Sequence, residues 1–222
     1  MVDLTALSPS ERAHQLGNPE GEVGVELGLR LNNVNSKITD HVYGRLGLEA
    51  GMNVLEIGFG NGHLLPDLFR QSDNLKYVGI DISQTMIDEA RQFNAAQVAS
   101  GQAAFHLASA ESIPSDAARF DRVFAVNVIY FWADPLRPLQ EIRRVLHPEG
   151  VSVIAATTPA TSAATDFQRP EFGFHPRDDA TLIALHKQAG FTRVAVENYD
   201  ELVSKPDGSP WARSYYLIIA QP

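Results

Sequence analysis

Residues Val54 to Leu65, which read VLEIGFGNGHLL, decide the fold of this chain. The run Val54–Ile57 is short and apolar with one acid, which is typical of a buried parallel strand. Glycines follow at 58, 60 and 62, and glycine allows positive φ and a close approach of the backbone to a ligand. Apolar residues then recur at helical spacing, at 64, 65, 68 and 69. The stretch predicts a strand, a glycine turn and a helix, the opening unit of a nucleotide-binding α/β sheet.

The spacing of the three glycines indicates which ligand the turn binds. The dinucleotide fingerprint is G-x-G-x-x-G, whereas Gly58, Gly60 and Gly62 form G-x-G-x-G, one residue shorter. Glu56 would also repel a pyrophosphate in a partly dry site. The pattern suits a ligand with a cationic end and no phosphate, such as S-adenosylmethionine (SAM).

Taken together, Glu56-Ile57-Gly58-x-Gly60-x-Gly62 resembles motif I of the class I SAM-dependent methyltransferases, in particular the small-molecule enzymes of methyltransferase type 11. The resemblance covers the chain from about residue 20 to its end. The alternative is that the glycines serve packing only.

The order of the predicted elements and this resemblance imply an α/β fold. We expect a Rossmann-like, doubly wound, seven-stranded and mostly parallel sheet with an antiparallel C-terminal hairpin strand, in three α/β/α layers. We expect one domain over residues 1–222, with a helical cover at 1–50 and a SAM-binding core at 51–222.

Composition excludes several classes of protein. The 222 residues are 44% hydrophobic and 20% charged, as in an ordinary soluble domain. The net charge of −9 argues against a nucleic-acid partner. With no cysteine there is no disulfide, no cysteine-ligated zinc and no cysteine nucleophile, and no metal site is predicted. The start resembles no signal peptide and no apolar run is long enough to span a membrane, so a cytoplasmic protein is expected.

The second predicted strand, residues 76–80, ends at an acid, Asp81, that follows Gly62 by 19 residues. Ligands of open α/β sheets bind at such strand ends, where a carboxylate accepts the ribose hydroxyls. An acid at this place also binds ribose in NAD enzymes, so Asp81 does not separate SAM from NAD; it could instead cap the next helix. Ile82 would then offer an apolar face to adenine.

The residues after the third predicted strand, 103–107, are similar to the adenine loop of the family. The family's acid that accepts from the adenine amino group falls on Ser109, whose neutral hydroxyl should bind more weakly. The N–H of Ala110 could meet an adenine nitrogen, and Glu111 either contacts the cofactor or is solvated.

The fourth predicted strand, Phe120–Val126, is followed by Asn127-Val128-Ile129-Tyr130-Phe131-Trp132. In the family this position passes beside the methionine part of SAM and the acceptor, which implies a cofactor contact for Asn127. The two prolines that DNA-base methylases carry here are absent. Tyr130 is a catalytic candidate, and both Tyr130 and Phe131 are substrate-binding candidates; the alternative is that these aromatics are core.

The segment 157–176 is long for a loop in a compact domain, which indicates a functional connection. Because it leaves the end of a strand, we place Phe174 over the acceptor and consider His175 as a general base. The alternative for His175 is an ordinary exposed histidine.

At the N-terminus, Ser8, Pro9 and Glu11 predict a helix start. Two further helices are predicted, around Val23–Leu31 and Ile38–Leu46, with a polar loop at Asn32–Ser36 between them. By resemblance, Gly21–Asn35 is similar to a lid over SAM and the acceptor.

At the C-terminus, Phe191–Tyr199 and Trp211–Ala220 predict an antiparallel pair of strands. The turn signals Lys205-Pro206-Asp207-Gly208-Ser209-Pro210 lie between them.

The predicted reaction is methyl transfer from SAM to a nucleophilic atom of a small molecule, with S-adenosylhomocysteine (SAH) as the product. Such a displacement needs chiefly alignment and exclusion of water. The alternatives are a non-catalytic SAM-binding module and an NAD-dependent oxidoreductase. The sequence makes no prediction about the acceptor's identity or the oligomeric state.

Overall fold

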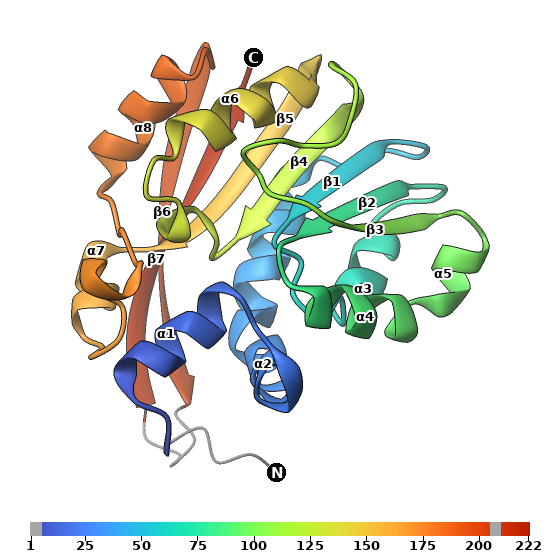
Figure 1. Cartoon of the computed structure of the whole chain (residues 1–222). Helices are drawn as coiled ribbons and strands as arrows, with labels where there is room; N and C mark the ends of the chain where they lie inside the picture. The colour runs from blue at the N-terminus through green and yellow to red at the C-terminus, as the bar shows by residue number, and fades with distance from the viewer. Residues whose placement is uncertain (1–5, 205–209) are drawn as a thin grey trace.

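The computed structural model describes residues 6–204 and 210–222. A seven-stranded sheet lies at its centre, with the strand order β3-β2-β1-β4-β5-β7-β6 (Figure 1). The strands are β1 Asn53–Ile57, β2 Lys76–Asp81, β3 Ala103–Leu107, β4 Phe120–Val126, β5 Leu146–Thr157, β6 Arg193–Ser204 and β7 Pro210–Gln221. β7 runs antiparallel to β5 and β6, and the other neighbouring pairs are parallel. The predicted sheet is confirmed; of the predicted turn, Lys205–Ser209 lie outside the described residues.

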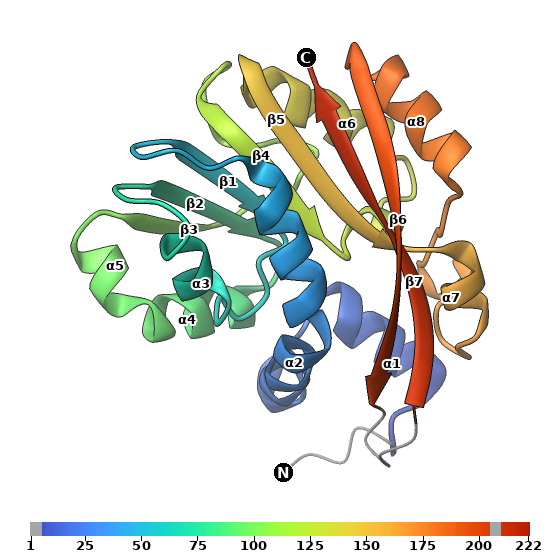
Figure 2. The ribbon, with the colours of Figure 1, turned by 180° about the vertical axis from the view of Figure 1, so that it is seen from behind.

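Helices cover both faces of the sheet. The described helices are α1 Pro9–Gly17, α2 Gly21–Leu46, α3 Leu65–Phe69, α4 Gln84–Phe93, α5 Ala95–Ala99, α6 Leu136–Val145, α7 Pro159–Ala163 and α8 Asp179–Gln188, with 3-10 turns η2 Ile129–Phe131 and η3 Pro170–Phe172. α6 and α8 lie on the face toward the viewer in Figure 1, and α2 crosses the opposite face in Figure 2. Of the described helices, none has the length and apolar character needed to cross a membrane.

The core consists of two hydrophobic clusters, one on each side of the sheet. Successive residues of the inner strands alternate between them: Val123 packs beneath α6, whereas Phe124 packs beneath α2. Ile154 and Val153 of β5 alternate in the same way. Inner strands buried on both faces explain why their sequences are almost continuously apolar.

The helix starts follow the expected capping chemistry. Ser8 and Glu11 form a capping box at α1. Ser83 accepts the N–H of Met86 at the start of α4, and Asp178 accepts that of Thr181 at α8. These local signals predicted the element boundaries because each cap satisfies an orphan backbone N–H within the first turn.

The prediction of two helices separated by a polar loop at Asn32–Ser36 is wrong, because α2 runs without a break from Gly21 to Leu46. Asn32–Ser36 itself contains no glycine or proline that would end the helix. Its polar residues have tertiary roles instead: Asn35 accepts a hydrogen bond from Asn127 of the sheet at 3.0 Å.

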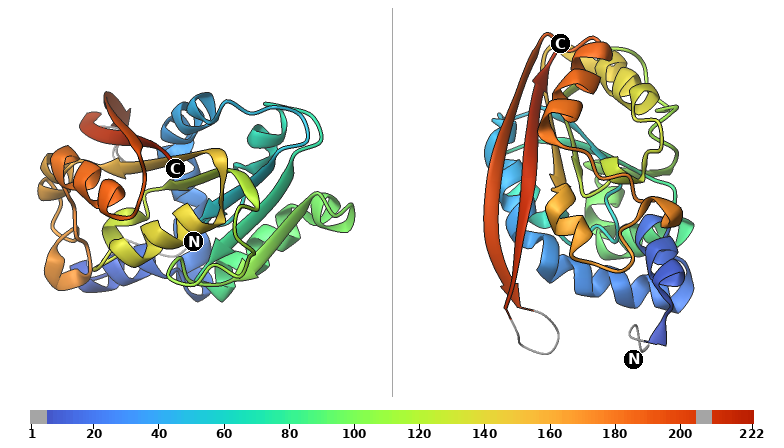
Figure 3. Two further views of the ribbon diagram at one scale, coloured as in Figure 1. Left: turned by 90° about the horizontal axis from the view of Figure 1, so that it is seen from above. Right: turned by 90° about the vertical axis from the view of Figure 1, so that its left-hand side faces the viewer.

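The chain topology creates a crevice above β1. β1 lies between β2 and β4, so the connections leaving these strands diverge to opposite sides, and ligands bind at such a switch point. α1 and the first half of α2 lie across the carboxyl ends of the parallel strands (Figures 1 and 3). The candidate site is therefore enclosed between the strand ends and the N-terminal helices.

Asn33 is exposed inside α2, so its substitution tests whether the helix is continuous. Asn33→Ala should raise the free energy of unfolding by about 0.5 kcal/mol, and Asn33→Pro should lower it by about 3 kcal/mol. Urea-induced unfolding measures both. Changes near zero for the two variants would contradict a continuous helix.

Candidate functional site

A cavity of about 560 Å³ lies at the carboxyl ends of the strands, a volume typical of a small-molecule site. All but one of the sequence-predicted residues line it, namely Glu56, Gly58, Gly60, Gly62, Asp81, Ile82, Ser109, Ala110, Glu111, Asn127, Tyr130, Phe131 and Phe174. The exception is His175. The two ends of the cavity differ in chemistry, with acids near β1 and β2 and aromatic residues near β4.

The three glycines of the turn all have positive φ, between 60° and 71°. A Cβ at Gly58 would lie 2.5 Å from Val128 Cγ2, and one at Gly62 would lie 2.8 Å from Ala90 Cβ. Packing therefore requires these two glycines. A Cβ at Gly60 would meet no heavy atom within 4 Å, so this residue faces open space where a ligand can approach the backbone.

Asp81 links the glycine turn to the end of β2. Its carboxylate accepts the N–H of Gly60 at 3.2 Å and the N–H of Ser83 at 2.9 Å. The side chain is 8% exposed, and burial raises its pKa to about 6, against the opposing effect of these hydrogen bonds. Asp81 thus holds both loops and still borders the cavity.

Glu56 is the second acid of the cavity. Tyr77 donates to its carboxylate at 2.6 Å. Burial raises the pKa of Glu56 to about 7, and the nearby Asp81 charge adds to that increase. A cationic ligand beside these two buried carboxyl groups would lower their pKa values and so favour their ionised forms.

Ile82 and the loop after β3 form the adjoining wall. Ile82 is 54% exposed although apolar. The Ser109 hydroxyl accepts the N–H of Glu111 at 3.2 Å, which turns the backbone at Ala110. Glu111 is exposed, and all four residues line the cavity.

Asn127 has φ 59°, a left-handed conformation that asparagine tolerates better than most residues. Its amide donates to Asn35 of α2, and its own Oδ1 is buried without a partner among the described residues. A buried unpaired acceptor at the cavity wall is a position where a ligand donor can bind.

Aromatic side chains form the wall near β4 and η2. Tyr130 stacks on Phe174 with ring centroids 5.2 Å apart, and Phe131 packs against both. Phe174 is almost fully buried, and burial raises the pKa of Tyr130 above its ordinary value. The hydroxyl of Tyr130 is therefore neutral at physiological pH.

The structure does not support the proposed role of His175, because this residue does not line the cavity. Its backbone N–H donates to the Tyr130 carbonyl at 2.6 Å, and its own carbonyl accepts from Arg177. With the backbone of His175 held in this way, the side chain of the neighbouring Phe174 lines the cavity.

Sequence reasoning missed three residues at the far side of the cavity, namely Thr157 of β5 and Trp211 and Arg213 of β7. Asn35, the last residue of the segment predicted to be a lid, also lines it. A signal for Arg213 was present: it shares its strand face with the buried residues Tyr215 and Leu217, so a buried cation could have been expected.

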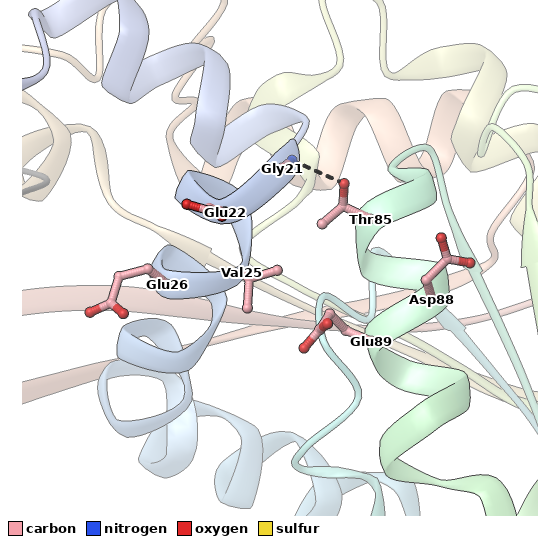
Figure 4. Close-up of a pocket in the computed structure, with 7 residues that line it drawn as sticks. All are labelled: Gly21, Glu22, Val25, Glu26, Thr85, Asp88 and Glu89. Atoms are coloured by element: carbon pink, nitrogen blue, oxygen red, sulfur yellow. Dashed lines mark hydrogen bonds between the residues drawn. The ribbon is translucent and has the colours of Figure 1, made fainter. Parts of the chain in front are cut away.

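A separate hollow lies between α2 and α4 (Figure 4). Glu22, Glu26, Asp88 and Glu89 give it an acidic lining, and the N–H of Gly21 donates to Thr85 at 3.2 Å. Within residues 6–204 and 210–222, no group of three or more His, Asp or Glu side chains could hold a metal ion.

The family model described as "Methyltransferase domain" matches residues 48–189, more than half of the chain. The chain belongs to this methyltransferase family. It is a SAM-dependent methyltransferase, and SAM is its cofactor, as the motif I resemblance indicated. The match covers the glycine turn, both acids and the aromatic segment after β4.

Among curated proteins, this methyltransferase is 27% identical over 163 residues to the uncharacterized methyltransferase YdaC of Bacillus subtilis, covering 73% of this chain and 84% of that protein. It is 30% identical over 119 residues to the O-methyltransferase resE of Aspergillus sclerotiorum, covering 54% of this chain and 45% of that protein. It is 29% identical over 120 residues to the 27-O-demethylrifamycin SV methyltransferase of Amycolatopsis mediterranei, covering 54% and 44%. The chain therefore spans less than half the length of the latter two.

Solved structures show the same fold. A putative methyltransferase in complex with the Haloferax volcanii Trm112 methyltransferase activator superposes with a TM-score of 0.72 and 19% identity, covering 88% of this chain and 93% of that one. Haemonchus contortus phosphoethanolamine N-methyltransferase 2 with bound SAM gives a TM-score of 0.68 at 15% identity, covering 84% and 52%. The Rossmann-like methyltransferase fold is thereby confirmed.

Gly60→Ala tests whether the cofactor approaches the open side of the glycine turn. Its matched control is Gly101→Ala, because Gly101 also has positive φ with no atom within 4 Å of a Cβ but does not line the cavity. Each variant should lose about 1 kcal/mol of stability from the left-handed backbone. Only Gly60→Ala should weaken SAM binding, by tenfold or more in a calorimetric titration; equal affinities would contradict the assignment.

Proposed function

We propose that this methyltransferase transfers the methyl group of SAM to a nucleophilic atom of a small molecule bound in the same cavity. The observation that carries the proposal is the division of one cavity into an acidic end and an aromatic end. An acidic end suits the cationic part of the donor, and an aromatic wall suits the apolar body of an acceptor. Residues 1–50 then serve as the cover of the 51–222 core.

The residues at the acidic end fit the chemical groups of SAM. Glu56 would lie near the cationic end of SAM and balance its charge. Asp81 would accept hydrogen bonds from the ribose hydroxyls, and the absence of a side chain at Gly60 would let the ligand approach the backbone. Ser109, Ala110 and Ile82 would border the adenine, with Glu111 at its edge. When bound, the sulfonium supplies an electrophilic methyl group.

The residues of this chain then align the acceptor and exclude water. Tyr130, Phe131 and Phe174 would form the apolar surface against which the acceptor packs, and the unpaired Oδ1 of Asn127 would accept a ligand N–H or O–H. Tyr130 is the remaining catalytic candidate, through its neutral hydroxyl. Methyl transfer from a sulfonium disperses charge, so positioning within a dry cavity accounts for catalysis without a strong base.

Two relatives support a small acceptor, since one is named an O-methyltransferase and the other a 27-O-demethylrifamycin SV methyltransferase. We extend this chemistry to the present chain as a proposal. An oxygen nucleophile is consistent with a cavity whose far wall is polar as well as aromatic.

The first experiment is calorimetric titration with SAM, SAH and NAD, followed by an assay of SAH formation. We expect micromolar binding of SAM and SAH and none of NAD. SAH should form when pooled phenols, carboxylates and amines of low molecular weight are added, and not when RNA or protein is added. Transfer only to a macromolecule would contradict the small-molecule acceptor, binding without any transfer would favour the non-catalytic alternative, and NAD binding would favour an oxidoreductase.

The raised pKa of Glu56, about 7, predicts a pH dependence of SAM binding. A cationic ligand binds the carboxylate form, so it lowers this pKa and its binding releases a proton. Because about one tenth of Glu56 is ionised at pH 6, SAM affinity should be about tenfold lower at pH 6 than at pH 8. Calorimetry across this range measures the change.

Glu56→Gln should flatten this profile above pH 6.5 and weaken binding at pH 8. The matched control is Glu111→Gln, which removes an exposed acid from the same cavity and should leave the slope unchanged. A slope that persists in Glu56→Gln would show that this residue does not face the cationic end.

A further inference from the structure

The proposed function leaves a buried arginine in the cavity wall without a role. Arg213 of β7 is 3% exposed, yet it lines the cavity. Its Nε donates to Glu201, the residue opposite it on β6, at 2.5 Å. Its Nη2 donates to the carbonyl of Val34 in α2. Across residues 6–204 and 210–222, no hydrogen bond engages Nη1.

The surroundings of Arg213 leave a local excess of positive charge. Glu201 is the carboxylate that pairs with Arg213, and the second oxygen of Glu201 lies 4.0 Å from Lys37 Nζ of α2. Two cations thus share one anion. Lys37 is 58% exposed and does not line the cavity, whereas Arg213 does, so the guanidinium is the cation that a ligand in the cavity can contact.

Sheet topology separates this cation from the acids of the donor end. The sheet runs in the order β2, β1, β4, β5, β7. Asp81 lies on β2 and Glu56 on β1, whereas Thr157 lies on β5 and Arg213 on β7. The N–H of Thr158, just past β5, donates to the carbonyl of Ser214, so Arg213 lies at the same edge of the sheet. At about 4.8 Å per strand, β7 lies roughly 14 Å from β1.

Aromatic residues lie between the two charged ends. Tyr130 and Phe174 stack beside η2, next to the end of β4. Arg213 and these two rings line the same cavity. The cavity thus runs from acids, past aromatic rings, to a buried arginine that is paired with Glu201.

We propose that Arg213 binds a carboxylate of the methyl acceptor, whose flat apolar body packs against Tyr130 and Phe174. This inference rests on the proposed function and names the class of acceptor. A single excess charge suits a monoanion better than a doubly charged phosphate, which Glu201 would repel. Because Arg213 lies far from the donor end, the carboxylate anchors the acceptor and is not the atom that receives the methyl group.

The test uses three probes that share one ring system and differ in charge: 2-naphthoate, 2-naphthamide and 2-naphthylmethylammonium. Each is titrated by calorimetry into protein saturated with SAH. Naphthoate should bind at least tenfold more tightly than the amide, because a charge-assisted hydrogen bond is stronger than a neutral one. The ammonium probe should bind most weakly.

Three variants separate recognition of the anion from a purely structural role of the arginine. The double variant Arg213→Gln/Glu201→Gln removes the ion pair without leaving a lone buried charge, and the preference for naphthoate should disappear. The control Glu201→Gln breaks the same pair but retains the cation, so the preference should persist or increase. Arg213→Lys, which keeps the charge, should retain a reduced preference.

Equal binding of naphthoate and naphthamide, no binding of either probe to SAH-loaded protein, or a preference that survives in the folded double variant would overturn the inference. If the double variant does not fold, the two single variants decide. The inference is overturned if both Arg213→Lys and Glu201→Gln bind naphthoate no more tightly than naphthamide. Failure of the unaltered protein to bind SAH would overturn the proposed function itself, and this assignment with it.

Discussion

The carboxylate of Asp81 is the interaction on which the site depends. By accepting the N–H groups of Gly60 and Ser83, it joins the turn after β1 to the loop after β2. The N–H of Gly58 donates to the carbonyl of Ile80 at 2.8 Å and adds a backbone link between the same two strands. The crevice between diverging connections is thereby held open, since neither loop can collapse into it without losing these bonds.

The opposite wall of the cavity is formed in part by α2, which polar contacts attach to β7 and to the connection after β4. Asn127 of β4's connection bonds to Asn35, and Arg213 of β7 bonds to the Val34 carbonyl. These contacts fall on two consecutive residues of one continuous helix. α2 is thus anchored at the aromatic and cationic end of the cavity, where enclosure would exclude water from the proposed acceptor.

Local patterns predicted most of the fold. An apolar run, a glycine turn and helically spaced apolar residues follow one another and located β1 and α3. Caps such as Ser8 and Ser83 located helix starts. Both kinds of signal act within a few residues. The acidic end of the cavity was predictable for the same reason: Glu56, the glycines and Asp81 lie at strand ends whose parallel arrangement brings them together.

The remainder required contacts between distant segments. The polar stretch at residues 32–36 looks like a loop because nothing in its vicinity satisfies three asparagines, whereas the partner of Asn35 is 92 residues away. Arg213 meets α2 across 179 residues, and its cavity role has no local signature beyond its position on the strand. His175 and Phe174 are adjacent in sequence, and only the packing around Tyr130 decides which one lines the cavity.

The sequence by itself therefore determined the Rossmann-like sheet, the cofactor class and the residues at the acidic end of the cavity, since short-range backbone requirements and charge specify them. Tertiary structure alone decided the continuity of α2, the exclusion of His175 and the presence of Arg213 at the far end. Each of these features depends on a contact between segments far apart in the sequence: Asn35 with Asn127, His175 with Tyr130, and Arg213 with Val34.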